Sequence, residues 1–371
     1  MLQGFRDPGP GPLVFRRLNV AKVALLTPYA TPVPGGISSF VSGLGRVLTD
    51  HGHTVTVLAG EGEGDTLEHS ELGHGRRYVA KAFRDLVNTR PDVVHCHSHW
   101  YTIAAAARYA REAARPRIVF SFHTTAMPTA RVLFARLLRE ADTVTFVSAA
   151  QLAEVREGLR LGGELRILRP ATDLRVPDAI AVERFAREFR LTGAFPVLAF
   201  VGPLEYRGKV DGVIDLIRGV RHVRERFPKV RLLIIGDGAL RRKVEEAAEG
   251  LGGDTVTITG FLSDPKVGLA NTHLYCHISR KEGLPIALLE AMSVGRCAIA
   301  SRTGGIPEVI DGSNGVLVED DPKLIAEAIY DLVVDADKRE RLGSEGRKTI
   351  ERHFTWGARW PLVSAVYGLG G

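Results

Sequence analysis

The chain has 371 residues, 45% of them hydrophobic and 25% charged, which is the balance of a soluble globular protein and enough length for two α/β domains. Its apolar runs all fall short of the ~18 residues that a membrane-spanning helix needs, and three widely spaced cysteines argue against a disulfide framework and for a reducing cytoplasm. The net charge of +6 favours anionic partners such as nucleotides, phosphates or acidic lipid surfaces. Nucleic acid is not expected as a partner, because no DNA- or RNA-reading module is recognisable and the arginines are spread over the whole chain.

Residues 1–19 contain Gly-Pro repeats and three arginines but no continuous apolar core. This composition is typical neither of a secretory signal nor of a membrane anchor. We expect a disordered leader there.

Beyond the leader, β-rich apolar runs alternate with helical segments, a pattern typical of parallel sheets wound on both faces. The first unit reads as a strand at 22–27, a loop at 28–36, a helix at 37–50 and a second strand at 54–59. The strands are near-continuously apolar, as expected for strands that are covered on both faces. Four more strands are expected in this half, at 92–97, 118–123, 143–148 and 165–168.

The segment 169–196 carries several prolines and charges and no strand period, so the junction between two domains is expected there. A second series of strands follows, at 197–201, 231–235, 255–259, 274–277, 297–300 and 315–318. Two successive doubly wound sheets present the loops at their carboxyl edges to a shared cleft, where α/β sheets bind ligands. We therefore predict a Rossmann-like domain at 20–180, a hinge at 181–195, a second Rossmann-like domain at 196–354, and a final helix within 355–371 that crosses back to the first domain.

The strongest chemical signal is the run 280–292, which reads RKEGLPIALLEAM. Glu282 is expected in a loop after a strand, and Glu290 lies about two turns further along the helix that follows. Both carboxylates can face one cleft, and the free amides at the helix start suit a phosphate or a sugar oxygen. Taken alone, the run is equally compatible with a helix that carries a solvated glutamate at each end.

The motifs that follow this run add to the signal. A Gly-Gly-Ile-Pro-Glu loop at 304–308 and an Asn-Gly turn at 314–315 come in order. Together with Glu282 and Glu290, they resemble the donor half of glycosyltransferase family 4. The resemblance implies that Glu290 holds the ribose hydroxyls of a nucleotide sugar and that Glu282 lies beside the anomeric carbon. It also implies donor contacts, some of them through backbone amides, from Leu284, Ile286, Ala287 and Gly305.

The amino-terminal half resembles the same family. Thr27-Pro28-Tyr29 precedes Gly35-Gly36-Ile37, and further matches run through 91–95 and 120–123. Gly35 and Gly36 allow a ligand to approach the backbone at the start of a helix, where amides and the helix dipole attract phosphate. A plain strand-to-helix turn is the alternative. The resemblance covers roughly residues 21–360 and implies the two-domain GT-B fold, with the donor on the second domain and the acceptor over the first.

His123 is expected at the carboxyl end of a strand, facing the cleft. The resemblance implies a histidine there that binds a sugar hydroxyl or stabilises charge between donor and leaving phosphate; a buried structural histidine is the alternative. His95, His97 and His99 share one face of a strand. No carboxylate or cysteine at ligand spacing joins them, so no metal site is expected, and His97 or His99 is a candidate for the acceptor pocket instead.

Gly236-Asp237-Gly238 lies between an expected strand and an expected helix and is similar to a dinucleotide fingerprint. Arg241 stands where the third glycine of that fingerprint belongs, so an NAD-dependent oxidoreductase is a minor alternative. The family resemblance implies that Gly238 lies near the nucleotide.

The pattern breaks where the family usually carries an Arg and a Lys that bind the diphosphate. Pro203 takes the Arg position and Gly208 the Lys position. Loss of one such cation can cost on the order of 10²-fold in rate. Arg207 and Lys209 flank the gap and are candidate substitutes, with a solvated loop as the alternative. The main alternative function is therefore a catalytically weak or inactive relative that acts as a sugar-nucleotide binder or partner subunit.

Residues 130–141 read as a helix with one apolar side and arginines elsewhere, which leaves docking on a membrane surface as an alternative to packing in the core. In sum, the family resemblance implies a metal-independent, retaining hexosyltransferase without a cofactor. Its partners would be a nucleotide-diphosphate sugar and a small-molecule, polysaccharide or lipid-linked acceptor. We expect it in the cytoplasm, with peripheral contact at the inner face of the membrane and the oligomeric state left open.

Overall fold

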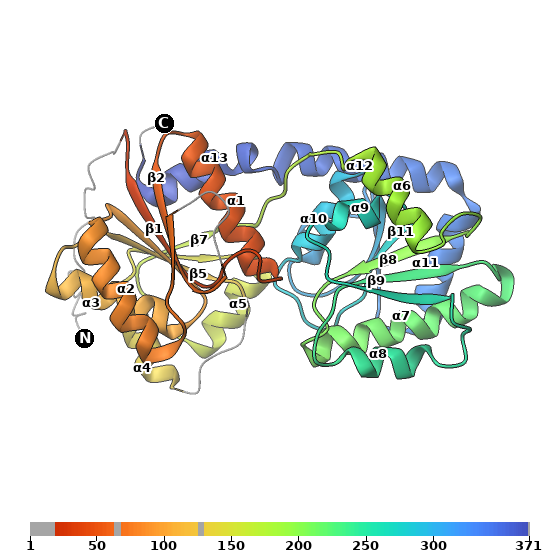
Figure 1. The fold of residues 1–371 in the computed structure, drawn as a ribbon, viewed down its shortest axis with the longest axis horizontal. Coiled ribbons are helices and arrows are strands. Elements are labelled where there is room, and N and C mark those ends of the chain that lie inside the picture. The colour runs from red at the N-terminus through yellow and green to blue at the C-terminus, as the bar shows by residue number, and fades with distance from the viewer. Residues whose placement is uncertain (1–18, 63–67, 125–129, 370–371) are drawn as a thin grey trace, which may run out of the picture.

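The computed structural model describes residues 19–62, 68–124 and 130–369. The expected leader lies outside these residues, apart from Asn19. The chain forms two α/β units that lie side by side, each built on one sheet with helices on both faces (Figure 1). The described residues form a seven-stranded sheet in the amino-terminal unit and a six-stranded sheet in the carboxyl-terminal unit.

The amino-terminal unit contains the strands β1 (Lys22–Tyr29), β2 (Thr54–Glu61), β3 (Glu68–Glu71), β4 (Val93–His97), β5 (Arg117–Phe122), β6 (Thr143–Phe146) and β7 (Glu164–Ile167), and the helices α1 (Gly36–Asp50), α2 (Gly75–Thr89), α3 (Trp100–Glu112), α4 (Arg131–Leu138) and α5 (Ala149–Gly158). The strand order is β3-β2-β1-β4-β5-β6-β7, with parallel pairing. Side chains of α2, α3, α4 and α5 form the core on one face of this sheet, and α1 covers the other face. Because both faces are covered, β4 is buried along its whole length.

The carboxyl-terminal unit contains the strands β8 (Val197–Val201), β9 (Arg231–Ile235), β10 (Val256–Gly260), β11 (Leu274–His277), β12 (Cys297–Ser301) and β13 (Val316–Val318), the helices α6 (Ala179–Glu188), α7 (Arg207–Arg226), α8 (Arg241–Ala248), α9 (Pro265–Leu269), α10 (Ile286–Ser293), α11 (Pro322–Val334) and α12 (Ala336–His353), and the short 3-10 helix η1 (Ile306–Glu308). The strand order is β10-β9-β8-β11-β12-β13. Helices α7, α8 and α11 cover one face, and α6, α9 and α10 cover the other.

Two doubly wound parallel sheets were predicted, and the structure confirms them. Strand β3 was not anticipated, because its four residues, EHSE, carry no apolar signal. The pairing of β3 with β2 extends the sheet of the amino-terminal unit by one strand. The three cysteines are buried free thiols, and no helix among the described residues combines the length and apolarity needed to cross a membrane.

The chain passes between the two units twice. The first passage follows β7 without regular structure up to Asp178, which caps α6. Phe185 of α6 packs in the core of the carboxyl-terminal unit, so this passage lies before α6 and ends earlier than the hinge expected at 181–195. The second passage leads from α12 into α13 (Trp356–Tyr367), which packs on α1 of the amino-terminal unit. There the Tyr367 hydroxyl and His95 Nδ1 form a hydrogen bond of 2.6 Å.

The strand order reverses once in each sheet, and these two points position the site. In the first sheet the reversal lies between β1 and β4, and in the second between β8 and β11. Loops leave neighbouring strands in opposite directions at such a point, which opens a crevice at the carboxyl edge. The loops after β8 and β11 therefore bring Lys209 and Glu282 towards one crevice.

Candidate functional site

Glu282 forms the centre of a charged cluster at the carboxyl edge of the second sheet. It follows β11, and its Oε1 lies 3.0 Å from Nζ of Lys209, which stands in the first turn of α7. The same oxygen accepts a hydrogen bond from Nε2 of His277 at 2.9 Å. Only 10% of the Glu282 side chain and 15% of the Lys209 side chain are exposed. The cluster thus joins the segment after β8, which carries Lys209, to the loop after β11, which carries Glu282.

The charge of Glu282 is stabilised despite its burial. Burial raises the pKa of its carboxyl, but the Lys209 ammonium and the His277 hydrogen bond outweigh this effect and hold the pKa at about 2. The carboxylate is therefore ionised throughout the neutral range. Burial lowers the pKa of His277 more than Glu282 raises it, so the imidazole is neutral there.

The Gly-Gly loop packs directly on this cluster. The amide of Gly305 donates to the carbonyl of Gly283 at 2.6 Å. A Cβ on Gly304 would come within 2.0 Å of the Glu282 carbonyl oxygen, and one on Gly305 would come within 2.6 Å of Cβ of Ser148 in the other unit. Only glycine allows this approach. Gly305 therefore supports the backbone around Glu282 and touches the amino-terminal unit.

His123 comes from the opposite unit to the same place. Its carbonyl oxygen would lie 3.1 Å from a Cβ on Gly283, the residue after Glu282. Its Nε2 is 2.9 Å from Nδ1 of His97, and its ring packs edge-on against Phe40 of α1. Burial lowers the pKa of His123 to about 3. The structure thus places the backbone of His123 next to the residue that follows Glu282, and the neutral imidazole of His123 lies against His97 and Phe40.

The starts of two helices also meet across the units. Gly35 precedes α1 and Gly36 is its first residue. Ile286, the first residue of α10, packs against the core cluster that contains α1. The unpaired amides in the first turn of each helix, including those of Ile286 and Ala287, lie near this junction and favour an anion there.

Glu290 lies on α10, eight residues after Glu282, which precedes that helix. Burial raises the pKa of its carboxyl to about 7; Asp264 and Asp173 act in the same direction and Lys266 acts against them. Lys266 is 3% exposed and donates to the backbone and side-chain oxygens of Asp173, at 2.6 and 2.5 Å. No hydrogen bond of the described residues involves the Glu290 carboxylate, which leaves it available to a ligand.

The remaining residues predicted to bind the donor differ in where the structure places them. Arg207 is exposed and makes no ion pair with a described residue. Gly208, where the family pattern places a cation, lies against Lys281, and Lys209, one position later, forms the ion pair with Glu282. Gly238 packs against the Leu204–Glu205 peptide, where a Cβ would come within 2.6 Å of the Leu204 carbonyl carbon. Leu284 is 7% exposed and belongs to the core.

A second cluster of polar and aromatic side chains lies at the carboxyl edge of the first sheet. His74 Nε2 is 2.6 Å from Glu61 Oε1, and its Nδ1 is 2.9 Å from the Tyr101 hydroxyl. The ring of Tyr29 packs edge-on against those of His74 and His99. Burial first, then Glu61 and then Tyr206 of the other unit raise the pKa of Tyr29. The cluster therefore faces Tyr206, which is 64% exposed.

Glu308 joins the two units directly. Its Oε1 accepts from the amides of Ala149 and Ala150 at the start of α5, at 2.7 and 3.2 Å. Its Oε2 accepts from Nε of Arg169 at 3.0 Å. A carboxylate at a helix start also meets the positive end of the helix dipole. Glu308 thus ties η1 of the second unit to α5 of the first.

We expect Glu308→Gln to loosen this contact. Hydrogen bonds to a charged group contribute about 1.5–3 kcal/mol each, so the amides of Ala149 and Ala150 should exchange hydrogen roughly tenfold faster or more. Native-state hydrogen exchange measures this directly. Glu327→Gln, the same change at an exposed position on α11, serves as the control; unchanged exchange at both amides in Glu308→Gln would contradict the assignment.

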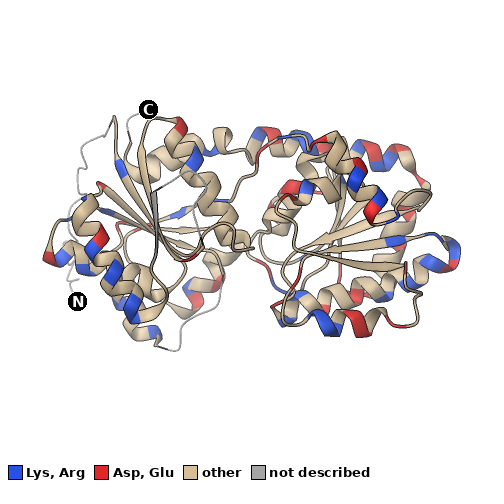
Figure 2. Cartoon of the chain, in the orientation of Figure 1, with Lys and Arg blue, Asp and Glu red and all other residues tan. Residues whose placement is uncertain are grey.

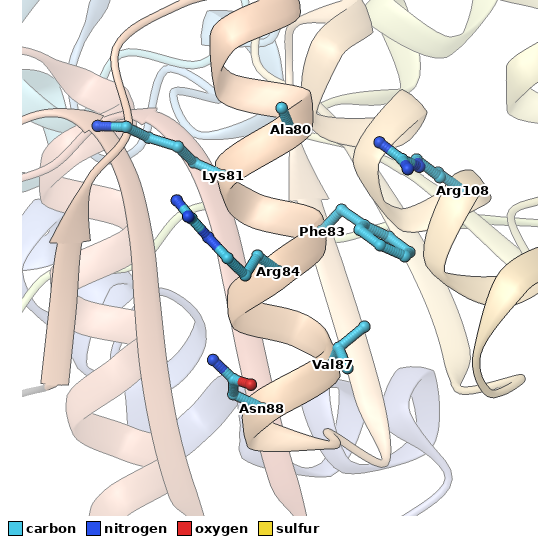
Figure 3. Close-up of a pocket in the computed structure, with 7 residues that line it drawn as sticks. All are labelled: Ala80, Lys81, Phe83, Arg84, Val87, Asn88 and Arg108. Carbon is cyan, nitrogen blue, oxygen red and sulfur yellow. The ribbon is translucent and has the colours of Figure 1, made fainter.

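A separate hollow lies on the amino-terminal unit, away from the cluster around Glu282. It has a volume of about 410 Å³ and opens between α2 and α3 (Figure 3). The Arg108 guanidinium stacks on the Phe83 ring at 4.1 Å. Its lining residues are Ala80, Lys81, Phe83, Arg84, Val87, Asn88 and Arg108. None of the predicted donor-site residues lines it.

Comparison with known proteins assigns this arrangement to a family. The family description "Glycosyltransferase Family 4" matches residues 34–176, and "Glycosyl transferases group 1" matches residues 195–335. A GDP-mannose-dependent α-(1-6)-phosphatidylinositol monomannoside mannosyltransferase of Mycobacterium tuberculosis is 27% identical, over 91% of this chain and 95% of that protein. A phosphatidyl-myo-inositol mannosyltransferase of the same organism is 28% identical, over 93% and 96%. The spore coat protein SA of Bacillus subtilis is 27% identical, over 90% and 96%.

Solved structures share the fold at lower identity. Anabaena HepE in complex with UDP-glucose superposes with a TM-score of 0.80 at 18% identity, over 94% of this chain and all of that one. The sucrose-phosphate synthase of Thermosynechococcus elongatus superposes with a TM-score of 0.79 at 21% identity, over 95% and 98%. The two facing sheets, together with the two family descriptions, therefore define a glycosyltransferase of the GT-B type. The chain belongs to glycosyltransferase family 4.

Three side chains around the site escaped the sequence analysis. His277 ends an expected strand, and Tyr275 shares its strand face, so the strand-end position could have indicated both. Lys266 could not have been found, because its contact with Asp173 spans ninety-three residues of sequence.

Proposed function

We propose that this chain is an active, retaining and metal-independent hexosyltransferase, with GDP-mannose as the first donor to test. The observation that carries the proposal is the buried Lys209–Glu282 pair beside His123. An ionised carboxylate and a cation at the strand-order reversal are what a bound sugar diphosphate requires. The choice of GDP-mannose is supported by the names of the two mycobacterial relatives.

The donor would lie along α10. Its ribose hydroxyls donate to Glu290, and its diphosphate meets the Lys209 ammonium and the amides at the starts of α10 and α1. Pro285 lacks an amide hydrogen, so the first usable donors on α10 are Ile286 and Ala287. Lys209 supplies the positive charge that other transferases obtain from a metal ion, which is the basis for proposing metal independence.

Transfer breaks the bond between the anomeric carbon and the phosphate oxygen, and the electron pair leaves with the diphosphate. Lys209 stabilises this developing charge. The acceptor hydroxyl forms the new bond and passes its proton to the oxygen of the departing diphosphate. Attack from the leaving-group face and a covalent intermediate on Glu282 both retain the anomeric configuration. We assign Glu282 the role of orienting the sugar, because two donors hold its Oε1 in place.

The acceptor would lie over the amino-terminal unit, next to His123. The Tyr29, His74 and His99 rings offer a surface for a sugar or cyclitol ring, and Glu61 offers a hydrogen-bond acceptor. Tyr206 would cover the acceptor from the donor side. Closure of the two units around both substrates then excludes water.

We further propose peripheral contact of the amino-terminal unit with an anionic membrane. Val132 and Leu133 at the start of α4 are 87% and 56% exposed. Lys and Arg positions are marked along α2 and α4 of this unit (Figure 2), and each cation near an anionic surface contributes about 1 kcal/mol. An exposed apolar pair flanked by cations suits the boundary of a bilayer.

The double change Val132→Ser with Leu133→Ser should lower binding to phosphatidylglycerol vesicles roughly tenfold, because burial of each side chain contributes about 1.5–3 kcal/mol when complete. Co-sedimentation measures the bound fraction. Val334→Ser, an exposed valine on α11, is the control. Equal binding of the double variant and the wild type would refute this contact.

Calorimetric titration with GDP and UDP, followed by detection of nucleotide release from GDP-mannose and UDP-glucose, tests the proposed function. We expect micromolar to millimolar affinity for one nucleotide and slow release from the matching sugar donor. Affinity without any release, with or without an acceptor, would favour the alternative function of a sugar-nucleotide binder or partner subunit. That alternative is suggested by Pro203 and Gly208, which stand where the family usually has an Arg and a Lys. Absence of affinity for both nucleotides at millimolar concentration would reject the donor site.

A further inference from the structure

Glu282 is the last member of a row of three hydrogen-bonded side chains, Tyr275, His277 and Glu282. Binding of the donor does not by itself require the other two. The Tyr275 hydroxyl lies 2.7 Å from Nδ1 of His277, and Nε2 of His277 lies 2.9 Å from Oε1 of Glu282. Tyr275 and His277 are two residues apart on β11, so their side chains share one face of the strand. Both are fully buried. The row runs from the core of the carboxyl-terminal unit to the crevice.

The positions of the hydrogens in this row follow from the chemistry of the groups. An ionised carboxylate can only accept hydrogen bonds, so Nε2 of His277 carries a hydrogen and donates it to Glu282. A neutral imidazole has one N–H, so Nδ1 is bare and accepts. The Tyr275 hydroxyl must then be the donor to Nδ1. Every group in the row has a partner, which a buried polar row requires.

The second carboxylate oxygen of Glu282, Oε2, takes no part in the contacts with His277 and Lys209 that these distances describe. Oε1 takes both the His277 hydrogen bond and the Lys209 contact, and no hydrogen bond of the described residues involves Oε2. The backbone of Glu282 is fixed by the Gly-Gly loop against Gly283. A carboxylate with one anchored oxygen and a fixed backbone has little freedom to rotate. Its free oxygen therefore has a defined direction.

We propose that His277 and Tyr275 are positioning residues for sugar transfer, which anchor Oε1 of Glu282 so that Oε2 faces the donor sugar. The inference rests on the proposed function, since it gives Glu282 a sugar to face. His277 acts on Glu282 directly. Tyr275 supplies the hydrogen that the bare Nδ1 needs and so keeps the ring in place. Neither residue touches the substrate.

A purely structural role predicts a different response from a positioning role. Loss of His277 removes a donor to the charged form of Glu282, and burial still disfavours that form, so the pKa of the carboxyl rises. In a variant without His277, the charged neighbour of Glu282 is Lys209 from α7, and the other titratable side chain nearby is Tyr275 from β11. Activity that needs the carboxylate is then lost as the pH falls through the raised pKa. A protein that is merely less well packed shows no such shift.

The test compares His277→Leu, His277→Gln and Tyr275→Phe with the wild type, using nucleotide release from the donor that the titration identifies. We expect His277→Leu to lower kcat roughly 10–100-fold, as loss of a supporting partner does elsewhere. The KM for the donor and the GDP affinity should stay within about threefold, and the pKa of the Glu282 carboxyl, measured by carbon-13 NMR, should rise by about one unit or more from its wild-type value of about 2. His277→Gln retains an N–H and should recover most of kcat. Tyr275→Phe should lower kcat by a smaller factor.

Matched controls separate these effects from general damage. His222→Leu makes the same change on α7 away from the crevice, and Tyr330→Phe makes the same change on α11; both should retain wild-type kcat. Thermal unfolding identifies any variant that does not fold, in which case Tyr275→Phe and His277→Gln carry the test. Full kcat in both His277 variants, or equal loss in both without a rise in the pKa of Glu282, overturns the proposal.

Glu282→Gln distinguishes this inference from the proposed function. If Glu282→Gln turns over the donor as the wild type does, the role of Glu282 itself is wrong. If Glu282→Gln is inactive while the His277 and Tyr275 variants are normal, only the positioning role is wrong. Nitrogen-15 NMR of the histidine rings needs no substrate and should show His277 with hydrogen on Nε2. A hydrogen on Nδ1 would overturn the proposal whether or not any donor is turned over.

Discussion

Replacement of Lys209 by methionine should lower kcat/KM for the sugar donor by about 10²-fold or more, the loss expected when a group that stabilises a leaving diphosphate is removed. Lys209 is the cation nearest to Glu282, at 3.0 Å, and only 15% of its side chain is exposed. Methionine keeps most of the stem and removes the charge. Burial raises the pKa of the Glu282 carboxyl and the Lys209 ammonium lowers it, so this pKa should also rise when the ammonium is removed. Both effects lower the rate.

The neighbouring Arg207→Met provides the contrast. Arg207 is exposed and pairs with no described residue, so its loss should change kcat/KM by less than about threefold, within the range of an exposed charge. Lys338→Met on α12 controls for the loss of one positive charge far from the crevice. Steady-state nucleotide release at several donor concentrations measures all three variants. The reverse order, with Arg207→Met as the inactive variant, would assign the diphosphate to Arg207.

Glu290→Gln should weaken nucleotide binding roughly 10–100-fold at pH 8, because two ribose hydroxyls lose their bonds to a charged acceptor. In the free protein, burial raises the pKa of Glu290 to about 7. Binding through the carboxylate draws on the ionised form, which is depleted below that pKa. Affinity of the wild type should therefore rise about tenfold between pH 6 and pH 8, and Glu290→Gln should lose this dependence.

Isothermal titration with GDP at pH 6, 7 and 8 measures both effects. The terminal phosphate of GDP also titrates in this range, but its contribution is common to the wild type and the variant, so the difference between them reports on Glu290. Glu327→Gln is again the matched control. A wild-type affinity that does not depend on pH, together with an unaffected Glu290→Gln variant, would remove Glu290 from the ribose site.

The sequence alone predicts the two sheets because their strands are buried on both faces and leave long apolar runs, as in β8, which is buried throughout. The loops that carry Glu282 and His123 follow from this, since each comes directly after an expected strand. The same reasoning misses β3, whose pairing with β2 is not encoded by an apolar pattern. Hydrogen bonds between backbones hold such an edge strand, and backbone bonds leave no trace in side-chain chemistry.

The position of the cation beside Glu282 shows a second limit of prediction from sequence. The family pattern puts Gly208 at the cation site, and alignment by spacing has an error of one residue in a loop. The structure starts α7 at Arg207, and the helical turn then directs Lys209, two residues later, towards Glu282 and leaves Arg207 in solvent. Which side of a helix faces the crevice depends on where the helix begins, and no local signal near Tyr206 defines that start, because its side chain makes no capping hydrogen bond.

Contacts between residues far apart in the sequence are a third feature that the sequence alone does not predict. Glu308 was part of a recognised motif, but its partners, Arg169 and the start of α5, become neighbours only when the two units pack together. Lys266 and Asp173 are a similar case. These contacts decide how the units sit relative to each other, and they depend on the packed fold rather than on any window of sequence.

Helix α13 has a consequence for how the protein is made. Val363, Val366 and Tyr367 belong to the core of the amino-terminal unit, and Tyr367 supplies the partner of the buried His95. A ribosome synthesises α13 after the strands of both sheets, so the amino-terminal unit keeps an uncovered apolar face until α13 has emerged. The nascent chain therefore cannot complete the amino-terminal unit before the carboxyl-terminal unit has been synthesised, and a premature stop near residue 355 should leave the amino-terminal unit prone to aggregation, although all its strands would be present.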